Sequence, residues 1–342
     1  METTSNNKTL KELGEVGIIN LIHGKVSSKL PPYIKKGIGD DCAVLETLGD
    51  RALLVTTDTL IEEIHFTAQT LPPEALGWKA LAVNISDIAA MGGKPRTAFL
   101  SIALKPDTKV SFLESFMEGL NDLADKTGVV LAGGNTVESP SCAVITITLL
   151  GGCLAEHVVY RSGARADDDL WVTGPLGNAA AGLFLLQNKQ APSLSEYESL
   201  VQAHQKPVPR LDMGKALGES GIAHAMIDIS DGIAKDLGHI CEQSNTGALL
   251  QATSIPMSDK LLKLAAEAKK KALDWVLHGG EDYELLFTAS PADREKIESI
   301  AAKVSNTPVT KIGTIITEAG VRLETEKGKE PLGPGGYVHF SG

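Results

Sequence analysis

Segments with helical periodicity alternate with short apolar segments along both halves of this chain of 342 residues. In the first half, the pattern predicts helices over residues 9–23, 72–91 and 110–126, and strands over 52–57, 97–104, 129–132 and 143–150. In the second half, it predicts strands over 170–173, 225–229, 283–289 and 309–316, and helices over 178–187, 232–243 and 292–303. This alternation predicts layers of helices on sheets, in an α/β or α+β arrangement.

A polar segment, residues 156–169, interrupts the alternation and ends in three consecutive aspartates. A chain of this length is expected to form two domains, at about 100–200 residues each. We therefore predict an N-terminal domain over residues 1–157 and a C-terminal domain over residues 158–342.

The charge balance restricts the classes of partner. Lys and Arg number 32 against 43 Asp and Glu, a formal net charge of −11, whereas a nucleic-acid-binding surface would be basic. No apolar run reaches ~18 residues, as a transmembrane helix would need, and the first residues are too polar for a signal peptide. The four cysteines form no C-x-x-C pair, which is typical of reduced thiols in a cytoplasmic protein. We expect a cytoplasmic location with no nucleic-acid or membrane partner.

Acidic or amide side chains occur beside glycines or strand ends at five places. They are the segments 37–41 (GIGDD), 56–58 (TTD), 84–87 (NISD, on a helix), 133–136 (GGNT) and 228–232 (DISDG). Taken singly, each fits a helix cap, a turn or an ordinary ion pair. Together they supply the oxygen ligands that Mg²⁺ prefers, next to glycine-rich turns whose N–H groups can bind phosphate. The set predicts Mg²⁺-assisted polyphosphate chemistry.

Three further features have two interpretations each. The segment 278–285 (HGGEDYEL) is either a loop that contributes to a site or an exposed acidic turn. Arg161 is suited to clamp a phosphate, or equally to form a salt bridge between the domains. His65 follows the second acidic segment, and a lone histidine is more often structural than functional.

Several familiar motifs are missing from the sequence. It contains no G-x-x-x-x-G-K-[ST], no G-x-G-x-x-G after a strand, no H-E-x-x-H and no G-x-S-x-G. Ordinary P-loop, dinucleotide-binding, zinc-protease and serine-hydrolase sites are therefore not predicted.

In their order, the motifs resemble those of the thiamine-monophosphate kinases, a family of the PurM-like superfamily that includes aminoimidazole ribonucleotide synthetase. The matching segments are 37–45 (GIGDDCAVL), 56–66 (TTDTLIEEIHF), 79–92 (KALAVNISDIAAMG), 133–136 (GGNT), 160–164 (YRSGA), 228–237 (DISDGIAKDL) and 279–285 (GGEDYEL). The ordered set is far more specific than any one of its members. The resemblance implies a two-domain PurM-like α+β fold. In that fold, the N-terminal sheets of a homodimer pair into a barrel, and a C-terminal α/β domain completes the nucleotide and substrate site.

The resemblance also implies an activity and a set of site residues. Members of the family transfer the γ-phosphoryl group of ATP to thiamine monophosphate and form thiamine diphosphate. The positions that match Mg²⁺ ligands are Asp41, Thr56, Thr57, Asp58, Asp87, Asn135, Asp228 and Asp231. Those that match ATP contacts are Gly134, Asn135, Arg161 and Ser230, and those that match substrate contacts are His65, Glu281 and Tyr337. Asp40, Asn84, Asp236 and Asp282 lie in the same motifs without an assigned role.

Asn135 is a departure from the family pattern, which has aspartate at this position of the Gly-Gly-Asp-Thr motif. Asparagine keeps one ligand oxygen but loses the negative charge. A metal ion there would be held more weakly, or through water.

The acceptor in this reaction is already a phosphate oxyanion, so charge neutralisation and alignment matter more than a strong base. We expect direct in-line transfer with no covalent nucleophile, in preference to an aspartyl phosphate intermediate.

Two alternative functions stay open. One is another ATP-using enzyme of the superfamily, such as aminoimidazole ribonucleotide synthetase, selenophosphate synthetase or a hydrogenase-maturation protein. The other is a non-catalytic sensor of nucleotides or divalent cations, to which only Asn135 points.

Overall fold

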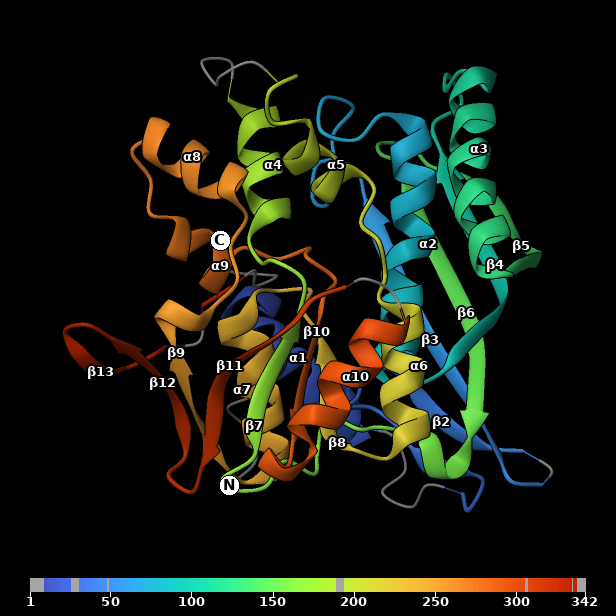
Figure 1. Cartoon of the computed structure of the whole chain (residues 1–342). Coiled ribbons are helices and arrows are strands. Elements are labelled where there is room, and N and C mark those ends of the chain that lie inside the picture. Colours follow the sequence, from blue (N-terminus) through green and yellow to red (C-terminus); the bar gives the residue numbers. More distant parts are fainter. Residues whose placement is uncertain are drawn as a thin grey trace.

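The computed structural model describes residues 9–25, 31–47, 49–188, 194–304, 307–333 and 335–336. Two sheets, each with its own helices, lie side by side (Figure 1). The sheet of six strands comes from the first half of the chain, and the sheet of seven strands comes from the second half. The chain therefore has a mixed α+β fold in two domains.

The six-stranded sheet has the order β1-β2-β3-β6-β4-β5. Its strands are β1 (Ile34–Lys36), β2 (Ala43–Glu46), β3 (Arg51–Ile61), β4 (Lys94–Leu104), β5 (Val130–Glu138) and β6 (Val144–Leu154). All neighbouring strands are antiparallel except β4 and β5. Buried and more exposed residues alternate along β3, so that one face of the sheet meets helices and the other does not.

Helices α2 (Pro73–Ala90) and α3 (Val110–Thr127) cover the inner face of this sheet. They approach closely through two glycines: a Cβ at Gly77 would lie 1.9 Å from the Phe116 carbonyl oxygen, and one at Gly119 would lie 1.8 Å from that of Glu74. Helix α2 packs against β3, β6 and α3, and also against α6 and β8 of the second half. It is buried along nearly its whole length, so its polar side chains must find partners in the interior.

The seven-stranded sheet has the order β13-β12-β9-β11-β7-β10-β8 and is antiparallel except between β9 and β12. Its strands are β7 (Asp169–Thr173), β8 (Ala223–Asp228), β9 (Gly247–Gln251), β10 (Leu285–Ala289), β11 (Val309–Ile316), β12 (Gly320–Thr325) and β13 (Gly328–Pro331). The α-helices of this half are α4 (Asn178–Gln187), α5 (Glu198–Gln205), α6 (Leu211–Ser220), α7 (Ile233–Ser244), α8 (Asp259–Glu267), α9 (Ala272–His278) and α10 (Arg294–Val304). Single-turn 3₁₀ helices lie at η1 (Ala155–His157), η2 (Ala252–Ser254) and η3 (Pro291–Asp293).

Helix α1 (Leu10–Lys25) bends at Gly14, whose φ of 67° is not helical.

The structure confirms the predicted alternation and corrects it in two respects. The predicted strand 129–132 is β5, which extends to Glu138, so the GGNT segment lies inside an edge strand and not in a turn after it. In the second half, β9, β12, β13, α5, α6, α8 and α9 were not predicted, since they are short and mix polar with apolar residues. The mostly antiparallel pairing decides for an α+β fold over an α/β fold.

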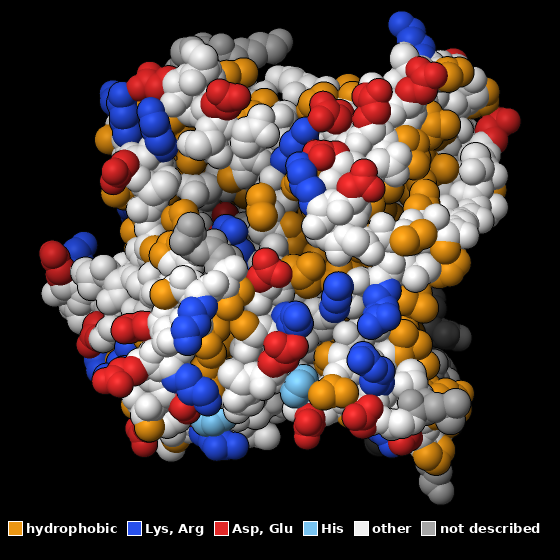
Figure 2. All heavy atoms as spheres, turned by 45° about the vertical axis from the view of Figure 1, so that its right-hand side comes forward, with side chains coloured by type: hydrophobic (Ala, Val, Ile, Leu, Met, Phe, Trp, Pro, Cys, Tyr) orange, Lys and Arg blue, Asp and Glu red, His pale blue; other side chains and the backbone are white. Residues whose placement is uncertain are grey.

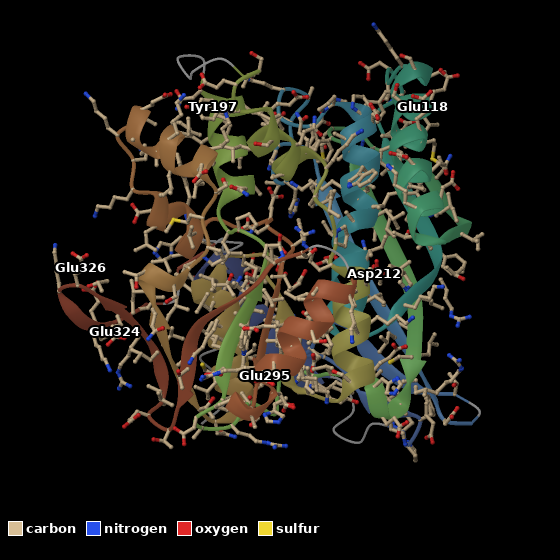
Figure 3. All side chains as sticks on the ribbon, viewed as in Figure 1. Glu118, Tyr197, Asp212, Glu295, Glu324 and Glu326 are labelled. Carbon is tan, nitrogen blue, oxygen red and sulfur yellow. The ribbon has the colours of Figure 1, made fainter. Side chains whose placement is uncertain are left out.

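Most acidic side chains lie on the surface. Glu118, Glu295 and Glu326, labelled in Figure 3, are exposed and project from the outside of the molecule. Such carboxylates account for much of the net charge without forming a site. Within the ranges described above, no helix is both long and apolar enough to cross a membrane.

Candidate active site

Three carboxylates from distant parts of the chain meet between the two domains. One oxygen each of Asp41, Asp87 and Asp228 lies within 4.8 Å of the others. Asp41 precedes β2, Asp87 lies in the last turn of α2, and Asp228 ends β8. Because α2 packs against both β3 and β8, it brings residues of the two sheets to one place. We call these three residues and Asp58 the carboxylate cluster.

Strand β3 supplies Asp58 and Thr56 on its inner face, toward α2. The hydroxyl of Thr56 donates a hydrogen bond to Asp87 Oδ2, and the carboxyl of Asp58 is hydrogen-bonded to that of Asp87. Burial raises the pKa of Asp58, although the contact with Asp87 lowers it.

Backbone and side-chain contacts fix Asp41 in the cluster. The Cys42 N–H donates to Met91 Sδ at 3.1 Å, which holds this segment against the end of α2. The Arg161 Nη2 lies 2.6 Å from Asp41 Oδ1 and its Nε lies 3.2 Å from the same oxygen. Arg161 thus forms the salt bridge between the domains that was one of its two interpretations. Asp41 Oδ2 is buried and has no hydrogen-bond partner among the described residues.

The cluster holds more negative charge than its surroundings neutralise. Burial, and then the neighbouring carboxylates, raise the pKa of Asp87 well above its usual value. Burial and Asp41 raise the pKa of Asp228 to about 8, although the Ser86 hydroxyl donates to Asp228 Oδ2 at 2.6 Å. Oxygen-only donors, an unpartnered buried lone pair and displaceable protons together fit a hard divalent cation.

Two loops of the C-terminal domain border the cluster and are tied to each other. The Glu281 N–H donates to the Ser230 carbonyl at 2.8 Å, and the Tyr283 N–H donates to the Ile229 carbonyl at 2.9 Å. The buried carboxylate of Asp236 accepts from the N–H groups of Asp231 and Gly232, at 3.2 and 3.1 Å, and so shapes the turn into α7. The Asp231 carboxylate pairs with Lys235 at 2.7 Å.

Glu281 is held by two buried cationic or polar side chains. Lys79 Nζ of α2 lies 2.6 Å from Glu281 Oε1, and His204 Nδ1 of α5 lies 2.9 Å from Glu281 Oε2. Lys79 and His204 are each only 1% exposed. Despite the effect of burial, Lys79 and His204 lower the pKa of Glu281 to about 2, so this carboxylate is an anion at neutral pH.

The backbone around Glu281 is strained. Glu281 has φ 67° and Tyr283 has φ 50°, in the left-handed region that non-glycine residues rarely occupy. Such conformations persist where surrounding contacts over-determine them, and they concentrate at functional sites. Here the contacts are the backbone bonds to the 228–231 turn and the ion pair with Lys79.

Some residues implied by the resemblance lie away from the carboxylate cluster. Thr57 is on the outer face of the sheet, with its hydroxyl 3.1 Å from that of Thr148. Gly134 and Asn135 lie on β5, and two strands separate β5 from β3, a spacing of roughly 14 Å. His65 follows β3, and its Nδ1 accepts the Ile61 N–H at 3.0 Å. Tyr337 lies outside the described residues.

The structure gives local roles to the motif residues that had none. Asp40 Oδ1 accepts the N–H groups of Asp41 and Arg161, both at 3.2 Å. Asp282 accepts the N–H groups of Gly177 and Ala179 at the start of α4, and burial raises its pKa to about 7. Asn84 is fully buried on α2 and donates to the Ala80 carbonyl at 3.1 Å.

Sequence reasoning missed four side chains at the site: Lys79, Ser86, His204 and Tyr283. Lys79 had a usable signal, since it is the single basic residue in the segment 79–92, whose residues are mostly apolar. His204 had none, because its contact with Glu281 depends on how α5 packs.

Two family models match most of the chain. "AIR synthase related protein, N-terminal domain" matches residues 39–155, and "AIR synthase related protein, C-terminal domain" matches residues 165–326. The thiamine-monophosphate kinase of Escherichia coli (strain K12) is 38% identical over 332 residues, 96% of this chain and 98% of that protein. That of Bacillus subtilis (strain 168) is 36% identical over 308 residues, 89% and 93% of the two chains. The solved structure of AaThiL complexed with AMPPCP and TMP is similar with a TM-score of 0.84 at 33% identity, covering 98% of this chain and 100% of that one.

Proposed function

The chain belongs to the AIR synthase related proteins and, among them, to the thiamine-monophosphate kinases, and from this premise we propose how its residues carry out the reaction. It phosphorylates thiamine monophosphate with ATP to give thiamine diphosphate. The bond between the γ-phosphorus and the ADP oxygen breaks, and a bond forms to a phosphate oxygen of thiamine monophosphate. The observation that carries the site assignment is the meeting of Asp41, Asp87 and Asp228 in one interior group.

We assign several Mg²⁺ ions to this region, since its residues fit the ion. The carboxylates of Asp41, Asp58, Asp87 and Asp228 would hold Mg²⁺, with Thr56 and Asp231 at the margin, whereas the Thr57 side chain faces away from this group. When bound, Mg²⁺ neutralises phosphate charge and orients the reacting oxygens. The cluster itself serves as ligand, and no residue is assigned as a covalent nucleophile.

The ATP contacts are assigned to Arg161, Ser230, Gly134 and Asn135, of which Arg161 and Ser230 border the carboxylate cluster and the other two lie on β5. A guanidinium has five N–H donors, and Arg161 uses those on Nε and Nη2 for Asp41, which leaves donors for phosphate. Burial lowers the pKa of Arg161, but its pairing with Asp41 and the neighbouring Asp40 more than offsets this and raises the pKa, so Arg161 keeps its charge. A permanent cation at this position favours in-line transfer between two anionic phosphates.

The thiamine monophosphate contacts are assigned to His65, Glu281 and Tyr337. An anionic Glu281 offers acceptor oxygens to the amino group and the cationic ring of thiamine. Because His65 Nδ1 accepts the Ile61 N–H, a neutral His65 ring carries its proton on Nε2, where it can donate a hydrogen bond.

We propose that two copies pair through the outer face of the six-stranded sheet and form the barrel that the family resemblance implies. No helix of the described residues covers this face, and it includes the exposed apolar side chains Phe99, Val130 and Val137. In Figure 2, hydrophobic side chains gather on the right-hand side, where this domain lies. Pairing would also complete the environment of Asn135, which one chain leaves on an edge strand.

We expect sedimentation velocity to give a dimer for the wild type and a monomer for Phe99→Glu.

ADP release from ATP–Mg²⁺, with and without thiamine monophosphate, tests the function. We expect ADP only when thiamine monophosphate is present, with an equal amount of thiamine diphosphate resolved by chromatography. ADP that forms without this dependence would favour another synthetase of the superfamily. Binding of ATP with no ADP would favour a sensor.

Asn135→Asp tests the departure from the family motif. We expect the Mg²⁺ concentration that gives half-maximal rate to fall severalfold, because a carboxylate restores a charged ligand. Asn135→Gln keeps an amide and serves as the control. An unchanged Mg²⁺ requirement in Asn135→Asp would remove this position from the metal sites.

The raised pKa values predict how Mg²⁺ stabilisation depends on pH. In the metal-free folded protein, the raised pKa values make the carboxyl groups of the cluster bind more protons than in the unfolded chain. The stability that this proton binding gives is complete below about pH 4 and is lost as pH rises through about 8. Mg²⁺ competes with these protons and therefore binds better at high pH. We expect the Mg²⁺-induced rise in Tm to be larger at about pH 8.5 than at about pH 6. An equal rise at both values, measured by calorimetry, would contradict this.

We further propose that the two domains divide at residues 157–158. We also propose that the reaction takes place in the cytoplasm. The four cysteines form no C-x-x-C pair, and this pattern supports the proposed location.

A further inference from the structure

A cavity of about 290 Å³ lies at one end of strands β3, β4 and β6, next to the end of α2 and to α6. Its charged or titratable lining residues are Arg51, Lys94, Arg96, His157, Lys215 and Glu219. We call it the basic pocket. It shares no lining residue with the carboxylate cluster or with the other residues assigned to the reaction.

Strand register brings the basic side chains together. Arg51 is paired with Leu154 of β6, and Lys94 is paired with Gly152 of the same strand. The pairing of β4 with β6 shifts at Arg96, between Pro95 and Thr97, and such an irregularity redirects a side chain. The central position between these cations is a glycine for a steric reason: a Cβ at Gly152 would lie 2.5 Å from the Ala52 carbonyl oxygen.

The described residues leave most of the positive charge of the basic pocket without a neutralising carboxylate. Glu219 is its single carboxylate, and it lies 3.7 Å from Lys215. Arg51, Lys94 and Arg96 form no ion pair with any residue in the described ranges. Acidic residues outnumber basic ones, 43 to 32, so an excess of basic residues does not explain this grouping. Three unpaired cations around one hollow create a positive potential that attracts an anion.

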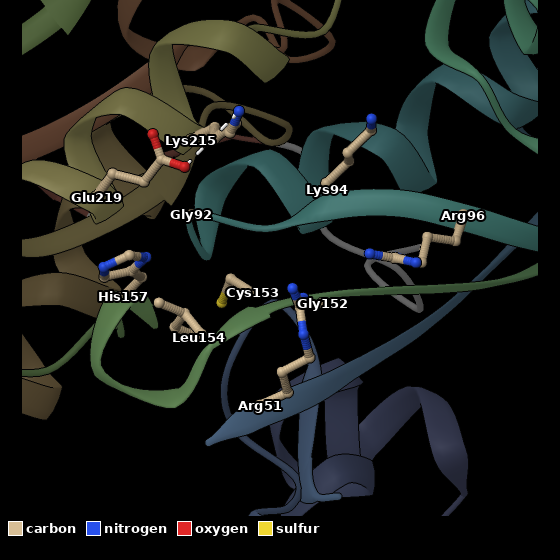
Figure 4. A pocket seen from close by; sticks show the side chains of 10 residues that line it. All are labelled: Arg51, Gly92, Lys94, Arg96, Gly152, Cys153, Leu154, His157, Lys215 and Glu219. Carbon is tan, nitrogen blue, oxygen red and sulfur yellow. Dashed lines mark ion pairs between the residues drawn. The ribbon is translucent and has the colours of Figure 1, made fainter. Parts of the chain in front are cut away.

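We propose that the basic pocket binds a small molecule through a phosphate or diphosphate group, clamped between Arg51 and Arg96. Figure 4 shows both guanidinium groups directed toward the space beside Gly152, with the ring of His157 on the far side of the pocket. Planar guanidinium groups bind phosphate oxygens in pairs, whereas lysines act as point charges. The volume is at the lower limit of about 300 Å³ for small-molecule sites, which suits a phosphate ester and excludes a dinucleotide.

The test uses inorganic pyrophosphate as the probe and isothermal titration calorimetry on the full chain, with EDTA present. Asp87→Asn serves as the background, so that Mg²⁺-dependent binding at the active site does not contribute. We expect one site per chain, with an affinity that falls as ionic strength rises. Arg51→Gln with Arg96→Gln should weaken binding about 10-fold or more, since charge-assisted hydrogen bonds are lost.

Two control pairs make the result specific. Arg165→Gln with Arg322→Gln removes the same charge outside the pocket and should leave the affinity unchanged. Arg51→Lys with Arg96→Lys keeps the charge but loses the paired geometry, and should weaken binding. The proposal is overturned if the wild-type pocket does not saturate, if the outside pair weakens binding equally, or if the lysine pair binds as well as arginine. None of these outcomes depends on kinase turnover, so failure here leaves the proposed function intact.

Discussion

Asp87→Asn is expected to lower kcat for thiamine diphosphate formation by about 10³-fold or more, as loss of a preorganised electrostatic group in an active site does. Asp87 is the centre of the carboxylate cluster, since it contacts Asp58 and Thr56 and lies within 4.8 Å of Asp41 and Asp228. An amide there cannot become an anion and is a poor ligand for Mg²⁺. Steady-state kinetics with ATP–Mg²⁺ and thiamine monophosphate measures the effect, and added Mg²⁺ should not restore the rate.

The same substitution should not unfold the protein. Burial, and then the acidic neighbours, raise the pKa of Asp87, so a neutral side chain costs less here than a charged one in the metal-free protein. Asparagine is neutral at every pH and keeps the shape of the group, so we expect the metal-free Tm to rise. Asp122→Asn, on the exposed face of α3, is the matched control for kinetics and Tm. Full turnover in Asp87→Asn would remove the residue from the metal ligands.

Local patterns predicted the helices and strands of the N-terminal domain better than its topology. Helix α2 follows from Pro73 and a long apolar segment, whereas the pairing of β3 with β6 depends on contacts about 90 residues apart, which no local pattern contains. The GGNT segment was mistaken for a turn because glycine is rare in strands. Gly134 is required inside β5, since a Cβ there would lie 1.7 Å from the Leu100 carbonyl oxygen.

The residues of the candidate site could likewise be predicted only in part from the sequence. Clustered aspartates beside glycines predicted oxygen ligands, and the family resemblance supplied their roles. Alternation along a strand puts Thr57 and Asp58 on opposite faces, but the sequence could not show which of the two faces the interior. It also could not pair Lys79 with Glu281, since that contact crosses from one domain to the other.

Lys79→Met is expected to lower the free energy of unfolding by about 3–5 kcal/mol, as removing one partner of a buried ion pair does. Methionine fills a similar volume but leaves the Glu281 carboxylate with His204 alone. The pKa of Glu281, about 2, lies below its usual value of 4.5, so the pair stabilises the fold above about pH 4.5 and loses this effect as pH falls toward 2. Chemical denaturation of the wild type and the variant at neutral pH measures the difference.

A second substitution separates stability from the role of Glu281 in the reaction. Without Lys79, the pKa of both Glu281 and His204 should rise, because Lys79 favours the anionic glutamate and the neutral histidine. The KM for thiamine monophosphate should then increase more than that for ATP. In Lys79→Met with Glu281→Gln, the buried charge is gone, so we expect most of the stability to return while the KM for thiamine monophosphate stays high. If the double variant were no more stable than Lys79→Met, the loss would come from packing and not from the unpaired carboxylate. If its KM returned to the wild-type value, Glu281 would have no part in binding the substrate.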